Sequence, residues 1–101
     1  MYNYNAALIR VVDGDTVWLR VDLGFRMFAE LSFRMAGINT AELNEAGGAA
    51  ARDALTALLR ALGPVFPIQT SKPDKYGRWL VTIGPVNAQM IALGHAVPYM
   101  V

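Results

Sequence analysis

Two runs with an apolar residue at every second position, separated by a glycine, constrain the fold of this chain most strongly. Apolar residues fill every odd position from 17 to 23 and again from 27 to 35, with Gly24 between the runs. A period of two is typical of a strand with one buried face. The two runs therefore predict paired strands whose odd-numbered side chains face the core, with Trp18, Arg20 and Arg34 on the opposite face.

Weaker patterns complete the expected element order. An apolar, β-branched run at 7–12 ends at the turn residues Asp13-Gly14-Asp15, so a short turn joins it to the first alternating run. Leucines at spacings of three and four, Leu55, Leu58, Leu59 and Leu62, predict an amphipathic helix over about 48–62. Further strands are expected at 65–70, where Pro67 suggests an edge or a bend, and at 78–83, and a short helix at 86–93.

The predicted order is three strands, a helix, two strands and a short final helix. This is the order of an OB-fold: a mainly β protein with a five-stranded barrel, and a helix between its third and fourth strands. The length of 101 residues, with 54% hydrophobic and 17% charged residues, fits a single packed domain over 1–101.

Composition excludes several chemistries. The chain has no cysteine, which removes disulfides, zinc–thiolate sites and thiol nucleophiles. A single histidine, His95, argues against a histidine metal cluster, and we expect its side chain to bond a carbonyl near a helix end. The net charge is only +1, so any phosphate site must concentrate its basic residues locally.

The sequence also bears on location and assembly. It has no apolar run long enough for a transmembrane helix, and its first residues do not match a signal peptide. We expect a monomer without a membrane partner, and a cytoplasmic rather than a secreted location.

Two groups of polar residues around the predicted hairpin could act on phosphates. Asp13 and Asp15 flank Gly14 in a sharp turn, and their hard oxygen ligands suit Ca²⁺ or Mg²⁺. The alternative is an ordinary turn, since Asp and Gly favour turns. Arg34 could clamp a phosphate through two parallel hydrogen bonds; the alternative is a surface arginine paired with Glu30 or solvated.

Two later groups add to the set. Asn39 and the carbonyl of Thr40 could supply further oxygen ligands, and Glu42 could act as a general base on water. The alternative for this segment is helix capping. The run Lys-Pro-Asp-Lys-Tyr-Gly-Arg at 72–78 supplies the local basic concentration, and its alternative is a charged solvent loop.

The joint order of these groups resembles the staphylococcal-nuclease (thermonuclease-like) family from about residue 7 to 99. The resemblance rests on Asp-Gly-Asp-Thr at 13–16, Phe-Arg at 33–34, Asn-Thr-Ala-Glu at 39–42, Asp-Lys-Tyr-Gly-Arg at 74–78, Val-Asn at 86–87 and Gly-His-Ala at 94–96. The combination is more specific than any one of these motifs.

The resemblance implies a calcium-dependent nuclease acting on DNA or RNA. Its Ca²⁺ ligands would be Asp15, Asn39 and Thr40, with Asp13 as a nearby carboxylate. Glu42 would help water attack phosphorus, and Arg34 and Arg78 would stabilise the transition state. Lys75, Tyr76 and Tyr99 would contact the substrate phosphate.

Two departures from the family's pattern keep a second interpretation open. Asn39 stands where the family has an acidic ligand, and Ala41 stands where proline is common. A non-catalytic OB-fold module that binds single-stranded nucleic acid or a protein partner is the alternative. Trp18 is expected to pack against the sheet, with base stacking as its alternative role.

Overall fold

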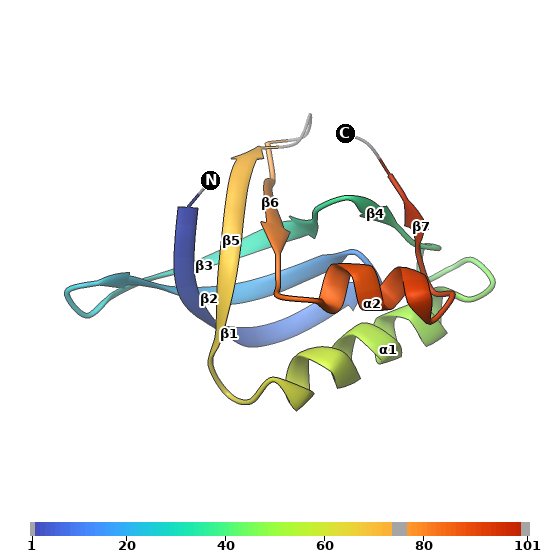
Figure 1. The fold of residues 1–101 in the computed structure, drawn as a ribbon, viewed down its shortest axis with the longest axis horizontal. Helices are drawn as coiled ribbons and strands as arrows, with labels where there is room; N and C mark the ends of the chain where they lie inside the picture. Colours follow the sequence, from blue (N-terminus) through green and yellow to red (C-terminus); the bar gives the residue numbers. More distant parts are fainter. Residues whose placement is uncertain (1, 74–76, 100–101) are drawn as a thin grey trace.

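The two alternating runs form the hairpin that the sequence predicts, and this hairpin is part of a closed barrel. The computed structural model describes residues 2–73 and 77–99. Strands β2 (Thr16–Gly24) and β3 (Met27–Met35) pair antiparallel, with Val17 opposite Phe33 and Val21 opposite Ala29. The barrel order is β1-β2-β3-β6-β5, closed between β5 and β1 (Figure 1). The prediction of a five-stranded OB-like barrel with two helices is confirmed.

The remaining elements follow the expected order. The bounds are β1 Tyr2–Asp13, β4 Ile38–Asn39, α1 Gly48–Ala61, β5 Phe66–Pro73, β6 Trp79–Thr82, α2 Val86–Ala92 and β7 Val97–Pro98. The pairing of β3 with β6 is parallel, whereas the other barrel pairs are antiparallel. Both helices lie side by side along one end of the barrel (Figure 1).

Strand β1 is longer than the 7–12 segment that the sequence indicates. Its first residues pair with β5, with Tyr2 opposite Thr70 and Asn5 opposite Pro67. No local sequence pattern indicates this long-range pairing, so the sequence alone does not predict a strand at the polar start of β1. At Pro67 the strand β5 has not yet met β6, whose pairing begins at Gln69. The position is therefore a local edge, where a missing N–H is tolerated.

Two bulges in β1 decide which side chains face outward. Leu8 pairs with Leu19 but Arg10 pairs with Trp18, so Ile9 is an extra residue. In an unbroken register Arg10 would oppose Val17 and point into the core. The bulge turns Arg10 to the outer face beside Trp18. A second bulge at Val12 likewise brings Asp13 opposite Thr16.

The core is built from the inward faces of the strands and one stripe of α1. Ala51, Leu55 and Leu59 of that helix are fully buried. The predicted leucine stripe is wrong at its end: Leu62 is 39% exposed because α1 ends at Ala61. Leu58 is only partly buried at the core's edge.

Segment 37–44, which falls between the predicted third strand and the predicted helix, contains the short strand β4. Ile38 pairs with Pro98 and Asn39 with Val97 of β7, forming a separate two-stranded sheet. The pairing joins residues far apart in sequence, which no local pattern indicates. It holds Asn39 in a defined backbone position at the end of the barrel.

The β2–β3 hairpin continues beyond the barrel, so its tip is exposed on both faces. Leu23, Met27 and Leu31 are inward by parity yet at least 40% exposed. The turn itself places Phe25 and Arg26 at φ of 56° and 59°, and the Phe25 residue is 97% exposed.

Within the described residues, no helix is long and apolar enough to cross a membrane.

Candidate active site

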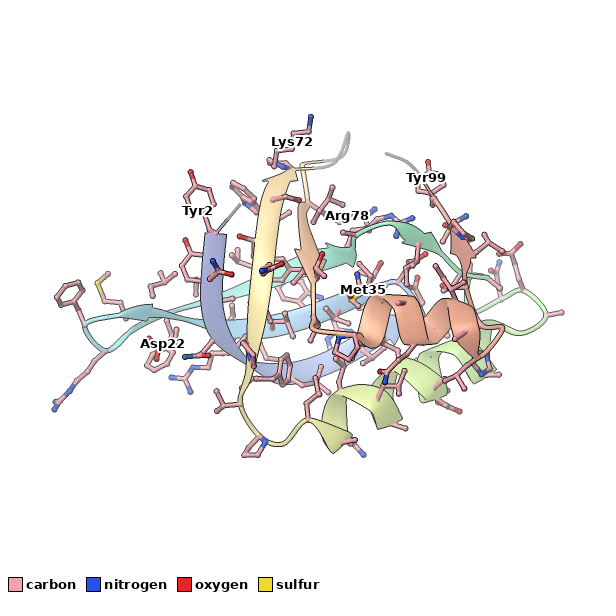
Figure 2. All side chains as sticks on the ribbon, in the orientation of Figure 1. Tyr2, Asp22, Met35, Lys72, Arg78 and Tyr99 are labelled. Carbon is pink, nitrogen blue, oxygen red and sulfur yellow. The ribbon has the colours of Figure 1, made fainter. Side chains whose placement is uncertain are left out.

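The predicted site residues meet where β1 turns into β2 and β3 ends. One row crosses three strands: Asp13 of β1 is opposite Thr16 of β2, which is opposite Arg34 of β3. A polar hollow of about 230 Å³ opens here, lined by Asp13, Asp15, Thr16, Arg34, Asn39, Thr40, Glu42, Glu45 and Arg78. Asp22, near the hairpin tip, lies apart from Arg78 and Tyr99 (Figure 2).

Asp15 is buried and held by three neighbours. Its Oδ1 accepts a hydrogen bond from Thr16 Oγ1 at 3.2 Å, and its Oδ2 accepts one from the Thr40 backbone N–H at 3.0 Å. Arg34 Nη1 is 3.4 Å from the same Oδ2. The side chains of Arg34 and Asp15 are only 10% and 12% exposed, so water screens this ion pair weakly.

Arg34 is positioned from both sides of its guanidinium. Nη2 donates to Asn39 Oδ1 at 3.2 Å, and the group lies over the Tyr99 ring, 5.4 Å from its centroid. Arg34 pairs with Asp15 rather than with Glu30, which was the alternative partner. Nη1 is buried and, despite its ion pair with Asp15, makes no well-aligned hydrogen bond to any described residue, so it retains donor capacity.

Arg78 approaches the same carboxylate through Thr16. Its Nη1 donates to Thr16 Oγ1 at 3.5 Å, and that hydroxyl donates in turn to Asp15. Arg78 is half-buried and immediately precedes β6. The guanidiniums of two residues that are 44 positions apart in sequence thus line one hollow.

The carboxyl group of Asp13, next to Asp15, has a raised pKa. Burial raises its pKa above the usual value, and the neighbouring Asp15 carboxyl raises it further. The Asp15 backbone N–H donates to Asp13 Oδ1 at 3.1 Å, which offsets part of this by favouring the ionised form. The net direction is upward, as for two like charges that share a confined space.

The loop after β4 approaches the Asp13–Asp15 turn so closely that Gly14 is required. A Cβ at Gly14 would lie 2.6 Å from Thr40 Oγ1 and 2.7 Å from the Ala51 Cβ. Thr40 Oγ1 is itself buried and has no hydrogen-bond partner in the described part of the chain. The contact brings the Thr40 backbone against Asp15, to which the Thr40 N–H donates.

Glu42 lies on the exposed rim of the hollow, and its backbone is held by a residue that sequence reasoning missed. The Glu42 N–H donates to Glu45 Oε1 at 2.7 Å. Glu45 belongs to none of the motifs, and its only signal is its spacing of three from Glu42. The capping alternative for Glu42 is not realised, since α1 begins at Gly48 after Gly47 with no side-chain cap.

Tyr99 reaches the site through the chain end. Its N–H donates to the Gly37 carbonyl at 2.8 Å, next to the β4–β7 pairing, and its ring lies under Arg34. The predicted contacts Lys75 and Tyr76 lie outside the described residues.

Asn87 is a second residue whose role sequence reasoning did not identify. Its Oδ1 accepts from the Ile83 N–H at 3.0 Å, and its Nδ2 donates to the carbonyls of Ala36 and Val81 at 2.9 and 3.1 Å. The side chain therefore ties α2 to the ends of β3 and β6. Arg34 lies near the end of β3, and Arg78 immediately precedes β6.

The donors suit a hard cation, with limited charge. Asp15 offers a carboxylate, Asn39 an amide oxygen and Thr40 a carbonyl, all oxygen ligands of the type Ca²⁺ takes. Over residues 2–73 and 77–99, no three acidic or imidazole groups cluster tightly enough to form a metal site by themselves. Asn39 Oδ1 is also engaged by Arg34. The set fits Ca²⁺ by ligand chemistry, with the backbone and amide supplying what carboxylates do not.

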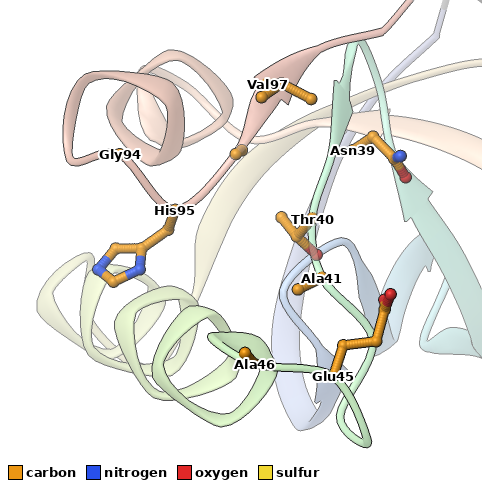
Figure 3. Close-up of a pocket in the computed structure, with 9 residues that line it drawn as sticks. Asn39, Thr40, Ala41, Glu45, Ala46, Gly94, His95 and Val97 are labelled. Carbon is orange, nitrogen blue, oxygen red and sulfur yellow. The ribbon is translucent and has the colours of Figure 1, made fainter.

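A second hollow of about 490 Å³ adjoins the first and shares Asn39, Thr40 and Glu45 with it. His95 lies across this hollow from Asn39 and Glu45 (Figure 3). Its backbone N–H donates to the Met90 carbonyl at 3.0 Å at the end of α2. The histidine is thus outside the carboxylate–guanidinium cluster.

No protein-family model matches the chain, and no curated protein matches it.

Proposed function

We propose that this protein is a calcium-dependent nuclease that hydrolyses phosphodiester bonds in DNA or RNA by attack of water. The observation that carries the proposal is the convergence of Arg34 and Arg78 on the hollow that Asp15 and Glu42 also line. The resemblance to the staphylococcal-nuclease family in the order of these residues supports the same activity.

The two guanidiniums would bind and neutralise the scissile phosphate. A phosphodiester is anionic, and negative charge builds on its oxygens as water adds. Arg34 is preoriented by Asp15, Asn39 and the Tyr99 ring, and its Nη1 retains donor capacity. A donor held in place before the reaction needs no reorganisation during it, which is the source of such stabilisation.

Glu42 would take the proton from the attacking water. Its carboxylate is exposed on the rim, where solvent enters, and its backbone is fixed by Glu45. Ca²⁺ held by Asp15, Asn39 and the Thr40 carbonyl would supply a positive charge that orients the phosphate and favours its attack. Asp15 would then serve both the cation and the orientation of Arg34.

The test is cleavage of end-labelled single-stranded DNA and RNA in millimolar Ca²⁺, with and without chelator. Glu42→Gln and Arg78→Ala should each lower the rate by about 10²–10³. Arg60→Ala removes an exposed arginine from α1 and is the matched control, expected to keep wild-type rates. A folded protein with no chelator-sensitive cleavage would sink the enzyme proposal.

A binding module without catalysis is the second candidate, and one observation favours it. The residue at the second acidic-ligand position is Asn39, and its oxygen already accepts from Arg34. A site used only for binding would need no cation. Strand binding that persists in chelator, with no cleavage under any Ca²⁺ concentration, would support this candidate over the nuclease.

A further inference from the structure

The outer face of the sheet continues from the hollow toward the hairpin tip, and aromatic and arginine side chains follow it. The row Asp13–Thr16–Arg34 lies at the hollow, and the next outward row is Arg10–Trp18–Ser32. Farther along, Arg20 and Phe28 are diagonal neighbours on β2 and β3. From Arg34 to Phe28 the face runs about 20 Å, at roughly 3.3 Å per residue.

A guanidinium lies over each of the two aromatic rings on this face, Trp18 and Phe28. Arg10 Cζ lies 5.8 Å from the Trp18 ring centroid, and Arg20 Cζ lies 4.1 Å from the Phe28 ring centroid. Arg10 has this neighbour only because the bulge at Ile9 turns it outward. Aromatic rings and guanidinium planes are the two surfaces on which nucleobases stack, and the arginines also attract phosphates.

We propose that a single strand of nucleic acid extends from the hollow along this outer face, with one base on Trp18 and a second on Phe28. The inference rests on the proposed nuclease function and names its substrate as single-stranded. It adds a strand-binding track, defined by Arg10, Trp18, Arg20 and Phe28, that is outside the catalytic hollow. The track is continuous with that hollow through the neighbouring rows of β1, β2 and β3.

The charges along the track favour nucleic-acid binding at its inner half, which is the half next to the hollow. Arg10 stands beside Trp18, with Ser32 on the other side of that row. Farther out, Glu30 is opposite Arg20 and Asp22 is opposite Phe28. Asp22 Oδ1 accepts from the Gly24 N–H at 2.8 Å within the turn. We therefore expect the nucleic-acid strand to bind more strongly at Trp18 and Arg10 than at Arg20 and Phe28, where Glu30 repels its phosphates.

Binding is measured by fluorescence anisotropy with labelled single-stranded DNA of 4 to 12 nucleotides, in chelator to prevent cleavage. Trp18→Ala should weaken binding of the longer strands by at least about fivefold, the scale of one lost stacking contact. Arg10→Ala should weaken it and lower its salt dependence. Glu30→Gln should tighten it, and Arg60→Ala should leave it unchanged.

Stacking on Trp18 has its own readout. Trp18 and Trp79 are the two tryptophans of the chain, so Trp79→Phe leaves Trp18 as the sole indole emitter. Added strand should quench that emission, whereas the Trp18→Phe variant, with only Trp79, should change little. Because Trp18→Phe keeps a ring, it should also bind more tightly than Trp18→Ala if both are folded.

The outcomes separate the track from the proposed catalysis. If the wild type cleaves, and Trp18→Ala and Arg10→Ala have the same KM for long strands as the wild type, the track is refuted and the nuclease proposal stands. Binding that depends on Trp18 without any cleavage would support the track and refute the nuclease. Neither binding nor cleavage by the wild type would refute both.

Discussion

Asp15, in the turn just before β2, and Arg34 of the adjacent strand β3 form one buried ion pair, with 3.4 Å between carboxylate Oδ2 and guanidinium Nη1. The Met35 N–H donates to the Asp15 carbonyl at 2.8 Å, so the two strands are also joined by their backbones at this point. The proposed cation ligand and the proposed phosphate clamp are therefore parts of a single structural unit.

Removing Arg34 should cost stability as well as activity. Arg34→Ala leaves Asp15 buried without its counter-charge, which typically destabilises by about 3 kcal/mol or more. Urea denaturation should show this loss, and Arg34→Ala combined with Asp15→Asn should recover part of it. If the double variant is no more stable than Arg34→Ala, the ion pair is not the cause.

Asn39→Asp should strengthen Ca²⁺ binding. An aspartate keeps the acceptor that Arg34 Nη2 uses and adds a negative charge to the oxygen ligands. Titration calorimetry should give an affinity about tenfold or more higher, because ligand charge tunes such sites. Asn3→Asp adds the same charge at the opposite end of β1 and should leave the affinity unchanged; equal gains from both variants would point to net charge alone.

Asp13 should make the protein less stable as pH rises. Its pKa is raised in the folded state, so the native protein holds a proton that the unfolded chain releases first. The stabilisation is complete below the unfolded pKa of about 4 and is lost as pH increases through the folded value. Asp13→Asn should therefore gain stability relative to wild type at pH 7 and lose that advantage at pH 3, measured by thermal unfolding in chelator. An advantage independent of pH would contradict this assignment.

Gly14→Ala should destabilise the site. The added methyl would overlap Thr40 Oγ1 and the Ala51 side chain, and such overpacking costs roughly 1–3 kcal/mol. Thr40→Ala removes the nearest atom, so the double variant should lose less than the sum of the two single variants. Strict additivity in denaturant unfolding would show that this contact does not limit the turn.

The hairpin turn should be improved by residues that accept a left-handed backbone. Phe25 and Arg26 both have positive φ, a conformation that asparagine and glycine tolerate better. Phe25→Asn with Arg26→Gly should raise the free energy of unfolding by about 1 kcal/mol or more, at the scale of strain for such positions. Strand binding should be unchanged, because neither residue belongs to the track.

Much of the candidate site could be anticipated because its motifs are local in sequence. The Asp-Gly-Asp turn, Arg34 at an even position of an alternating strand and the run ending in Arg78 each mark a place on the barrel. The contributions of Glu45 and Asn87 were not visible. Glu45 acts through a loop backbone and belongs to none of the motifs. Asn87 belongs to the Val-Asn motif at 86–87, but one carbonyl that it binds lies 51 positions away, so the motif did not show its role.

The sequence by itself determined the faces of β2 and β3, the element order and the residue types at the site, because side-chain periodicity and turn chemistry are properties of neighbouring residues. Only the tertiary structure decided the register. The bulges at Ile9 and Val12, the pairing of β1 with β5 and the β4–β7 sheet depend on contacts between distant segments. Those contacts turn Arg10 and Asp13 outward and bring Tyr99 under Arg34, because a shift of one residue moves a side chain to the other face of a strand.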